Sequence, residues 1–384
     1  MNQHAKIAVL HQSLAPPLFG GMCKPMKPGG YSDSGADIAC NLRDAGVPVI
    51  TPASRPDPAR DLDWVFPDTK DGIELALLAG ASVLWANTIL FNGHPLEDLH
   101  DRDVHIIGQQ PAAVHEFDDK WHTNLILASE GLPVAPGFLV FLKEVEGLLL
   151  ETLAAHGCPL PCVVKPIRGC GSDGVVKVST LDELKAAVSS LLRATTIDAG
   201  GGTWPKYGTS CMVERYLPGH EISVTVMPAG TYQIDGRKNI IERCWCLPPV
   251  ARFNHQGGIA PYNDIVAVTV TCNSRLLEPS ELADPRCREA LEFCARAGEV
   301  VGARAPIQVD CRADQSGRFF IIDLNMKPNM AGAGRVGREN QDSLTAIAAR
   351  AIGWCYLDLL LNMTRQAWPS SFVVPPQKPA ATFR

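Results

Sequence analysis

Apolar and polar positions follow two periods over the first 112 residues. Short apolar runs have the length of buried parallel strands, and they cover residues 6–10, 47–52, 81–87 and 103–109. Apolar positions at helical spacing predict helices over residues 34–45 and 70–79. Ser32 or Ser34 is the expected cap of the first helix, and Gly46 its end. This alternation predicts an open, mostly parallel α/β domain over residues 1–112.

Two further units follow along the chain. A helical stretch over 118–132 opens a small central unit of sheet and helix, expected over residues 113–213. Its predicted strands are 138–141, 162–165 and 175–178, and its predicted helices are 144–156 and 181–193. Residues 214–384 form the expected third unit. One strand is expected over 211–216, where this unit begins, and three more over 221–227, 307–313 and 319–325. A closing helix is expected over about 341–361.

Composition narrows the class of protein. The chain has 384 residues, of which 46% are hydrophobic and 20% charged, so a large core is expected and general disorder is not. The net charge is −6 and the basic residues are scattered, which argues against nucleic acid as a partner. The 13 cysteines are odd in number and include no CxxC, which favours reduced thiols over disulfides or a zinc site. Since no secretory signal and no membrane-length apolar run stand out, we expect a cytoplasmic protein that does not enter the membrane.

A glycine-rich segment lies between two predicted strands. Gly169, Gly171 and Gly174 have the spacing of a dinucleotide fingerprint. In that fingerprint a helix follows, whereas here a β-branched run over 175–178 predicts a strand. The loop therefore resembles a backbone anion nest with the positive charge of Lys165 beside it. A plain hairpin that binds no ligand is the alternative.

Two glutamates flank a predicted turn at Pro218 and Gly219. Glu214 is suited to an amine, and Glu221 to the vicinal hydroxyls of a ribose, so that together they suit an adenosine. Solvated glutamates beside a turn are the alternative interpretation.

A third element is a predicted hairpin with oxygen ligands on one face. Asp323 and Asn325 share a face because strand side chains alternate, and Asp310 lies across the ladder from them. Carboxylate and amide oxygens inside apolar strands suit Mg²⁺ that also holds nucleotide phosphates. Without a metal, these carboxylates would need a cation from elsewhere, such as Lys327.

With these elements in this order, the chain resembles an ATP-grasp enzyme, and in particular the D-alanine–D-alanine ligase branch. The resemblance implies an ATP-grasp fold: an N-terminal open parallel α/β domain, a small central lid domain and a C-terminal α+β catalytic domain. It also implies ATP and two Mg²⁺ ions as cofactors, with Mn²⁺ able to substitute, and a homodimer. The implied ATP-binding residues are Lys120, Lys165, Gly169, Gly171, Ser172, Gly174, Glu214, Leu217 and Glu221, and the implied metal ligands are Asp310, Asp323 and Asn325.

The implied reaction joins a carboxylate to an amine. The carboxylate attacks the γ-phosphate of ATP, and an amine then attacks the acylphosphate to give an amide, ADP and phosphate. Arg252 is the expected catalytic cation beside a closing loop over 254–263, and the N–H of Asn329 is expected to face the developing oxyanion. A kinase on the same scaffold and a non-catalytic nucleotide-binding protein are the alternatives.

The sequence departs from this family where the amino acids would bind. Gln308 stands where the family has an arginine, Asn329 where it has a glycine, and Gly334 where it has a serine. We therefore expect substrates other than D-alanine, with Arg335 or Arg338 as the anchor for a carboxylate. The N-terminal loop lacks the family's glutamate, and Asp33 is the nearest acid. At the end of a strand of the first domain, Asn87 and Thr88 are candidates for shaping the acyl-donor pocket.

Overall fold

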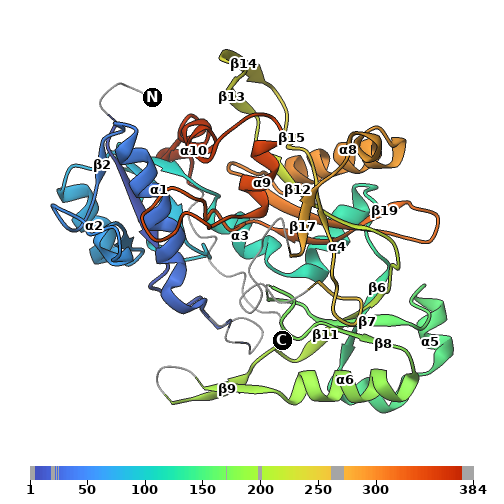
Figure 1. Ribbon diagram of the computed structural model, residues 1–384. Coiled ribbons are helices and arrows are strands. Elements are labelled where there is room, and N and C mark those ends of the chain that lie inside the picture. Colours follow the sequence, from blue (N-terminus) through green and yellow to red (C-terminus); the bar gives the residue numbers. More distant parts are fainter. Residues whose placement is uncertain are drawn as a thin grey trace.

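The computed structural model describes residues 5–18, 22, 24, 26–169, 171–197, 201–260 and 272–373. Figure 1 shows three sheet-containing units: the N-terminal one in blue, the central one in green and the C-terminal one in yellow to red. The mixed α/β architecture expected from the sequence is confirmed.

The N-terminal sheet has the strand order β2-β1-β4-β5-β20, with β3 also paired to β1. Its strands are parallel except for β20, which comes from near the end of the described chain and pairs antiparallel with β5. The strands are β1 (Ile7–His11), β2 (Val49–Ile50), β3 (Phe66–Pro67), β4 (Val83–Asn87), β5 (His105–Ile107) and β20 (Trp368–Pro369). The helices of this part are η1 (Pro28–Tyr31), α1 (Ser32–Asp44), η2 (Asp61–Asp63), α2 (Lys70–Leu78), η3 (Pro95–Leu99), α3 (Pro111–Phe117) and α4 (Lys120–Ser129).

Helix α1 begins earlier than the serines predicted. Its N-cap is Tyr31, which has left-handed backbone angles and makes no side-chain cap hydrogen bond. Ser32 and Ser34 therefore lie inside the first turn, where the Ser34 hydroxyl donates to the carbonyl of Tyr31 at 3.2 Å. The prediction of a serine cap is wrong, because the tight turn of η1 places Tyr31 at the N-cap of α1.

The central sheet has the order β6-β11-β7-β8 and its own apolar core, in which α5 and α6 pack against the strands. A small hairpin, β9–β10, extends from this unit. The elements are β6 (Gly137–Phe141), η4 (Leu142–Gly147), α5 (Leu150–Ala155), β7 (Cys162–Pro166), β8 (Val176–Val178), α6 (Leu181–Arg193), β9 (Thr195–Ile197), β10 (Thr203–Pro205) and β11 (Ser210–Arg215).

The C-terminal sheet has the order β17-β16-β12-β18-β19, with β15 also paired to β12. Helix α8 packs on one face, and α9 and α10 lie on the other with α1 beyond them (Figure 1). The strands are β12 (Glu221–Met227), β13 (Gly230–Ile234), β14 (Arg237–Ile241), β15 (Trp245–Cys246), β16 (Val250–Arg252), β17 (Ser274–Leu276), β18 (Ile307–Ala313) and β19 (Phe319–Asn325). The helices are α7 (Pro279–Leu282), α8 (Pro285–Val300), α9 (Leu344–Arg350), α10 (Tyr356–Thr364) and η5 (Ser370–Phe372).

Two expectations about helices need correction, and one helix was not expected. The helix expected over 144–156 is divided into η4 and α5, and the helix expected over 341–361 is divided into α9 and α10. Gly353, with a φ of 79°, lies between the latter two, and an L-residue adopts that angle at a cost. Helix α8 was missed, although Asp284 as N-cap followed by Pro285 is a recognisable start signal.

The cysteines in the described part of the chain are free thiols. Among the helices of the described residues, none combines the length and the apolar character that crossing a bilayer requires.

Candidate active site

A cavity that measures about 1500 Å³, counted together with the open solvent at its mouth, lies where the three units meet. Its walls come from the N-terminal loop, α3 and α4, the central strands and the β18–β19 hairpin. Most of the residues predicted for ATP and metal line it: Lys120, Lys165, Gly169, Gly171, Ser172, Glu214, Leu217, Glu221, Arg252, Asp310, Asp323 and Asn325.

The β18–β19 hairpin presents the predicted metal ligands. Asp310 is the cross-strand partner of Asp323, and Gln308 that of Asn325, which confirms the predicted register. Asp310 accepts hydrogen bonds from the Ser223 hydroxyl at 2.6 Å and from the Gln308 amide at 2.9 Å. The amide of Gln308 is thereby turned toward this carboxylate.

Burial, together with the charge of Asp323, raises the pKa of Asp310 to about 6. Two facing carboxylates of this kind repel each other unless a cation lies between or beside them. The donor set of two carboxylates and one amide, open to the cavity, therefore fits a hard divalent ion such as Mg²⁺. Within the described residues, no cluster of three or more His, Cys, Asp or Glu side chains suits a metal, and the third oxygen donor of the predicted set is the amide of Asn325.

Two lysines connect the other units to this hairpin. Lys120, the first residue of α4, places its ammonium group 2.6 Å from a carboxylate oxygen of Asp323. Lys165, on β7, is buried and donates to Glu214 and to the carbonyl of Ile322, each at 2.8 Å. Burial raises the pKa of Glu214, and the charge of Lys165 opposes that rise. The predicted nucleotide residues thus hold the central unit against β19.

The glycine loop joins β7 to β8, as the sequence predicted. Gly169, Gly171, Ser172 and Gly174 all have positive φ angles. At Gly174 an added Cβ would lie 2.9 Å from Leu191 and 3.0 Å from Pro166, so the position also lacks room for a side chain. Successive left-handed residues expose backbone N–H groups in a way that suits an anion.

Glu221 opens β12 at the far end of the cavity. Its carboxylate lies 2.9 Å from a ring nitrogen of His255 and 3.5 Å from a guanidinium nitrogen of Arg312. Arg252 is its cross-strand partner on β16 and is also buried. His255 belongs to the expected closing loop, of which residues 261–263 lie outside the described residues.

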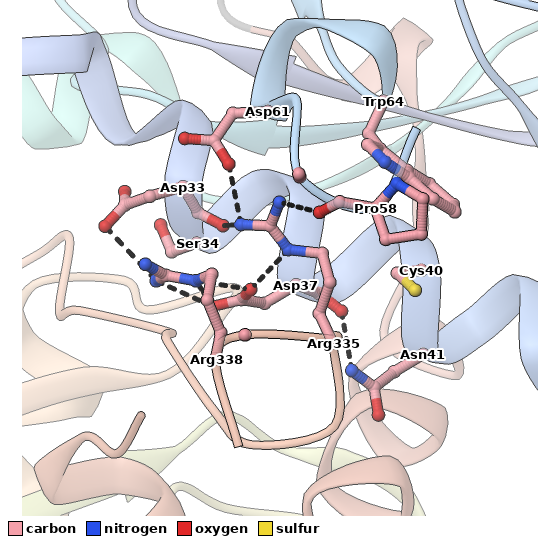
Figure 2. A network of polar contacts seen from close by, with 12 residues as sticks. Asp33, Ser34, Asp37, Cys40, Asn41, Pro58, Asp61, Trp64, Arg335 and Arg338 are labelled. Carbon is pink, nitrogen blue, oxygen red and sulfur yellow. Dashed lines mark hydrogen bonds and ion pairs between the residues drawn. The ribbon is translucent and has the colours of Figure 1, made fainter. Parts of the chain in front are cut away.

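The arginines predicted as substrate anchors do not line this cavity. Figure 2 shows both of them bound to the buried carboxylate of Asp37, on α1. The Nε atoms of Arg335 and Arg338 lie 2.9 and 2.8 Å from Asp37 Oδ1. Arg335 is 1% exposed and also contacts Asp61 at 2.6 Å, so its guanidinium group is enclosed by the protein. The structure gives both residues a role in joining the C-terminal unit to α1.

Asn329 and Gly334, which precede these arginines, do not line the cavity either. Asn329 is exposed and does not line the cavity, and its side chain accepts from the N–H of Ala331 at 3.0 Å. At Gly334 an added Cβ would lie 2.5 Å from the side chain of Asn41 on α1. A serine hydroxyl at this position would meet α1, so it could not serve as a substrate ligand in this arrangement.

Tyr31 and Lys327 are among the cavity residues that were not predicted as site residues. Tyr31 and Lys327 both line the cavity, and the ammonium group of Lys327 lies 3.6 Å from the centre of the Tyr31 ring. The sequence signal for Tyr31 was the PGGY turn, which directly precedes the first long helix. The sequence alone suggests Lys327 only as a counter-charge for the metal ligands.

Comparison with known proteins identifies the domain. Residues 158–242 match the family model described as an ATP-grasp domain. The chain is 28% identical over 212 residues to a D-alanine–D-alanine ligase of Actinobacillus succinogenes, which covers 55% of this chain and 58% of that ligase. A D-alanine–D-alanine ligase of Actinobacillus pleuropneumoniae is 30% identical over the same length, with the same coverage. The match thus spans less than three fifths of these relatives.

Solved structures extend the likeness to nearly the whole chain. A D-alanine–D-alanine ligase of Bacillus anthracis in complex with ATP has a TM-score of 0.60 at 15% identity, over 94% of this chain and 96% of that one. A D-Ala:D-Ser ligase of Enterococcus faecalis has a TM-score of 0.62 at 14% identity, over 94% and 98%. Residues 158–242 thus match an ATP-grasp domain, and the fold of the chain is similar to that of these solved ligases. Over part of its length, the chain also resembles D-alanine–D-alanine ligases in sequence.

Proposed function

We propose that the chain is an ATP-dependent ligase that joins a small carboxylic acid to an amine through an acylphosphate, with release of ADP and phosphate. The observation that carries this proposal is the convergence of three elements on one cavity. These are the oxygen ligands of the β18–β19 hairpin, the lysines of the central unit and α4, and the glycine loop.

Different residues of the cavity would bind different parts of the nucleotide. Glu214 and the backbone near Leu217 would receive the adenine amine, and Glu221 the ribose hydroxyls. Lys120, Lys165 and the loop from Gly169 to Gly174 would hold the phosphates. Asp310, Asp323 and Asn325 would hold Mg²⁺, which supplies charge neutralisation at the phosphates when bound.

Catalysis would then depend on positioning and electrostatics. Arg252, buried in the cavity wall, would supply a positive charge to the transferring group. The glycine loop and the loop that contains His255 would exclude water from the acylphosphate. No side chain needs to act as a nucleophile.

The substrates are proposed to differ from a pair of D-alanines. Gln308 contacts Asp310 and cannot supply the positive charge of the arginine that it replaces. Arg335 and Arg338 are bound to Asp37. The amino-acid end of the cavity therefore has different chemistry from the end proposed for the nucleotide.

The test is a screen of carboxylic acids against amines with ATP and Mg²⁺. ADP and phosphate are measured first, and the active mixtures are examined by mass spectrometry for a new amide. Amide formation with a pair other than two D-alanines supports the proposal. Phosphate release with D-alanine alone, at a rate no lower than with any other pair, would contradict the altered specificity.

Gln308 also favours a second candidate function. Without a cation at this position, a tetrahedral intermediate has less stabilisation, and a reaction that ends at phosphorylation becomes an alternative. The same screen separates the two: a small-molecule kinase forms ADP with one organic substrate and gives a stable phosphorylated product, with no amide.

A further inference from the structure

One part of the cavity wall lies where the N-terminal and C-terminal units meet. It includes Tyr31, at the start of α1, and Lys327, which follows β19. The side chain of Asn87, the last residue of β4, hydrogen-bonds to both of them. This wall is separate from the lysines that contact Asp323 and Glu214.

A strained turn fixes Tyr31 in this wall. Gly29, Gly30 and Tyr31 are consecutive residues with positive φ angles of 75°, 56° and 61°. At Gly30 an added Cβ would lie 1.8 Å from the carbonyl oxygen of Gln12, so only glycine allows this approach. A tyrosine in the left-handed region is uncommon, and such residues cluster at sites that bind ligands.

Asn87 couples the turn to Lys327. Its amide nitrogen donates to the carbonyl of Tyr31 at 2.9 Å, and its amide oxygen accepts from the Lys327 ammonium group at 3.0 Å. Lys327 lies over the ring of Tyr31, and its own N–H donates to Asn325 at 2.9 Å. A flexible lysine side chain is thus held at one place, beside the predicted metal ligands.

A smaller hollow continues from this point between the N-terminal and C-terminal units. Counted together with the open solvent at its mouth, it measures about 420 Å³, and it shares Lys327, Val114 and Met326 with the main cavity. Its remaining walls are largely apolar. They include Leu90, Ile107, Pro306, Met330 and Met363.

We propose that Lys327, positioned by Asn87 and Tyr31, is the substrate anchor: it binds the carboxylate of a small acid whose apolar side chain enters the smaller hollow. This inference rests on the proposed function and names the substrate class that it left open. A fixed ammonium group pairs with a carboxylate, and an adjoining apolar hollow favours an apolar side chain over a charged one.

The anchor is tested first by equilibrium binding, without turnover. Isothermal titration of the wild-type protein, with a non-hydrolysable ATP analogue and Mg²⁺, uses alanine, leucine and aspartate, each as both enantiomers. We expect at least one enantiomer of leucine to bind more tightly than the matching alanine and aspartate. The variant K327M should weaken that binding at least about tenfold, because it removes a charged hydrogen bond. K327R should retain part of the affinity.

Two controls separate binding from folding. K70M makes the same change at an exposed lysine on α2, and it should leave the affinity for the acid unchanged. Affinity for the ATP analogue should also be the same in K327M as in the wild type. A purely structural role for Lys327 would lower the midpoint of thermal unfolding without changing the affinity for the acid.

The outcomes of the two proposals are distinguishable. If an acid binds in a way that depends on Lys327 but no ADP forms, the proposed role of Lys327 is supported and the proposed ligase activity is contradicted. Amide formation with an unchanged KM for both organic substrates in K327M keeps the ligase and overturns the anchor. The anchor is also overturned if the wild type binds none of the six acids, or if aspartate binds more tightly than leucine.

Discussion

Two charged clusters of this protein use the same kinds of side chain in opposite ways. In the cavity, Lys120 contacts Asp323, and the cross-strand partner of that aspartate is Asp310. In the second cluster, Arg335 and Arg338 share Asp37 between α1 and the segment before α9 (Figure 2). The cavity cluster faces about 1500 Å³ of open space, whereas Asp37 has no exposed surface.

The difference shows that a charged residue is available to a ligand only when its partners can be exchanged. Arg335 donates to Asp37 and to the carbonyls of Pro58 and Asp33, all within the protein. Asp310 has polar partners as well, yet its pKa is raised, so its charged form is under-stabilised. The cavity cluster therefore suits an added cation, and the Asp37 cluster suits the joining of two units.

The largest expected effect is on turnover in the cavity cluster. Replacing Asp323 by alanine removes one predicted metal ligand and the partner of Lys120. We expect ADP formation with the best acid and amine to fall about a thousandfold, since a catalytic metal contributes several kcal/mol. The control is D101N, at an exposed aspartate outside the cavity. If D323A turned over ATP at the wild-type rate, the metal assignment would be wrong.

The next effect is on stability, in the Asp37 cluster. The substitution D37N leaves two guanidinium groups without their shared carboxylate. Breaking a buried ion pair in this way costs about 3 kcal/mol or more of unfolding free energy. Urea unfolding measures this loss, and the affinity for an ATP analogue should be unchanged in the folded protein. Wild-type stability combined with lost substrate binding would show that this cluster is a ligand site after all.

The contrast between these clusters marks the limit of what the sequence could predict. The hairpin was predictable because strand alternation and one short turn determine which face Asp310 and Asp323 share. The glycine loop was predictable because the β-branched run after it indicates a strand. Both arguments use residues that are close in the sequence.

The partners of Arg335 and Lys327 could not be predicted from the sequence. The partner of Arg335 is Asp37, 298 positions away in the chain, and the partner of Lys327 is Asn87, 240 positions away. Only the docking of the C-terminal unit on α1 decides which of these cations faces the cavity. The pairing of β20 with β5, across the expected domain boundary, was missed for the same reason.

A smaller effect concerns the exchange of partners inside the cavity. His255 contacts Glu221, the carboxylate proposed to bind ribose, at 2.9 Å. Because the ribose would have to displace this contact, H255A should bind an ATP analogue about two- to tenfold more tightly, the range that one net hydrogen bond covers. Isothermal titration measures the change, with H100A as a control at an exposed histidine. Weaker binding in H255A would indicate that His255 instead holds the nucleotide.

The smallest effect sharpens the comparison with an ion pair of the same chemistry at the surface. Arg275 contacts Glu281 through two hydrogen bonds of 2.7 and 2.8 Å. Both side chains are more than a third exposed, at 41% and 35%. The hydrogen bonds from Arg275 lower the pKa of Glu281 from 4.5 to about 2. Solvent screening limits the stability that follows from this pair to about 1 kcal/mol or less.

The pH dependence of that contribution has a definite sign. A carboxylate with a lowered pKa stabilises the fold fully above its unfolded pKa of 4.5, and this contribution is lost as the pH falls through about 2. Urea unfolding of the wild type and E281Q should therefore differ slightly at pH 7, and the difference should shrink as the pH is lowered below about 4. If E281Q lost as much unfolding free energy at pH 7 as D37N, burial would not explain the difference between the Arg275–Glu281 pair and the Asp37 cluster. The contrast between the cavity cluster and the Asp37 cluster would then need a cause other than exposure.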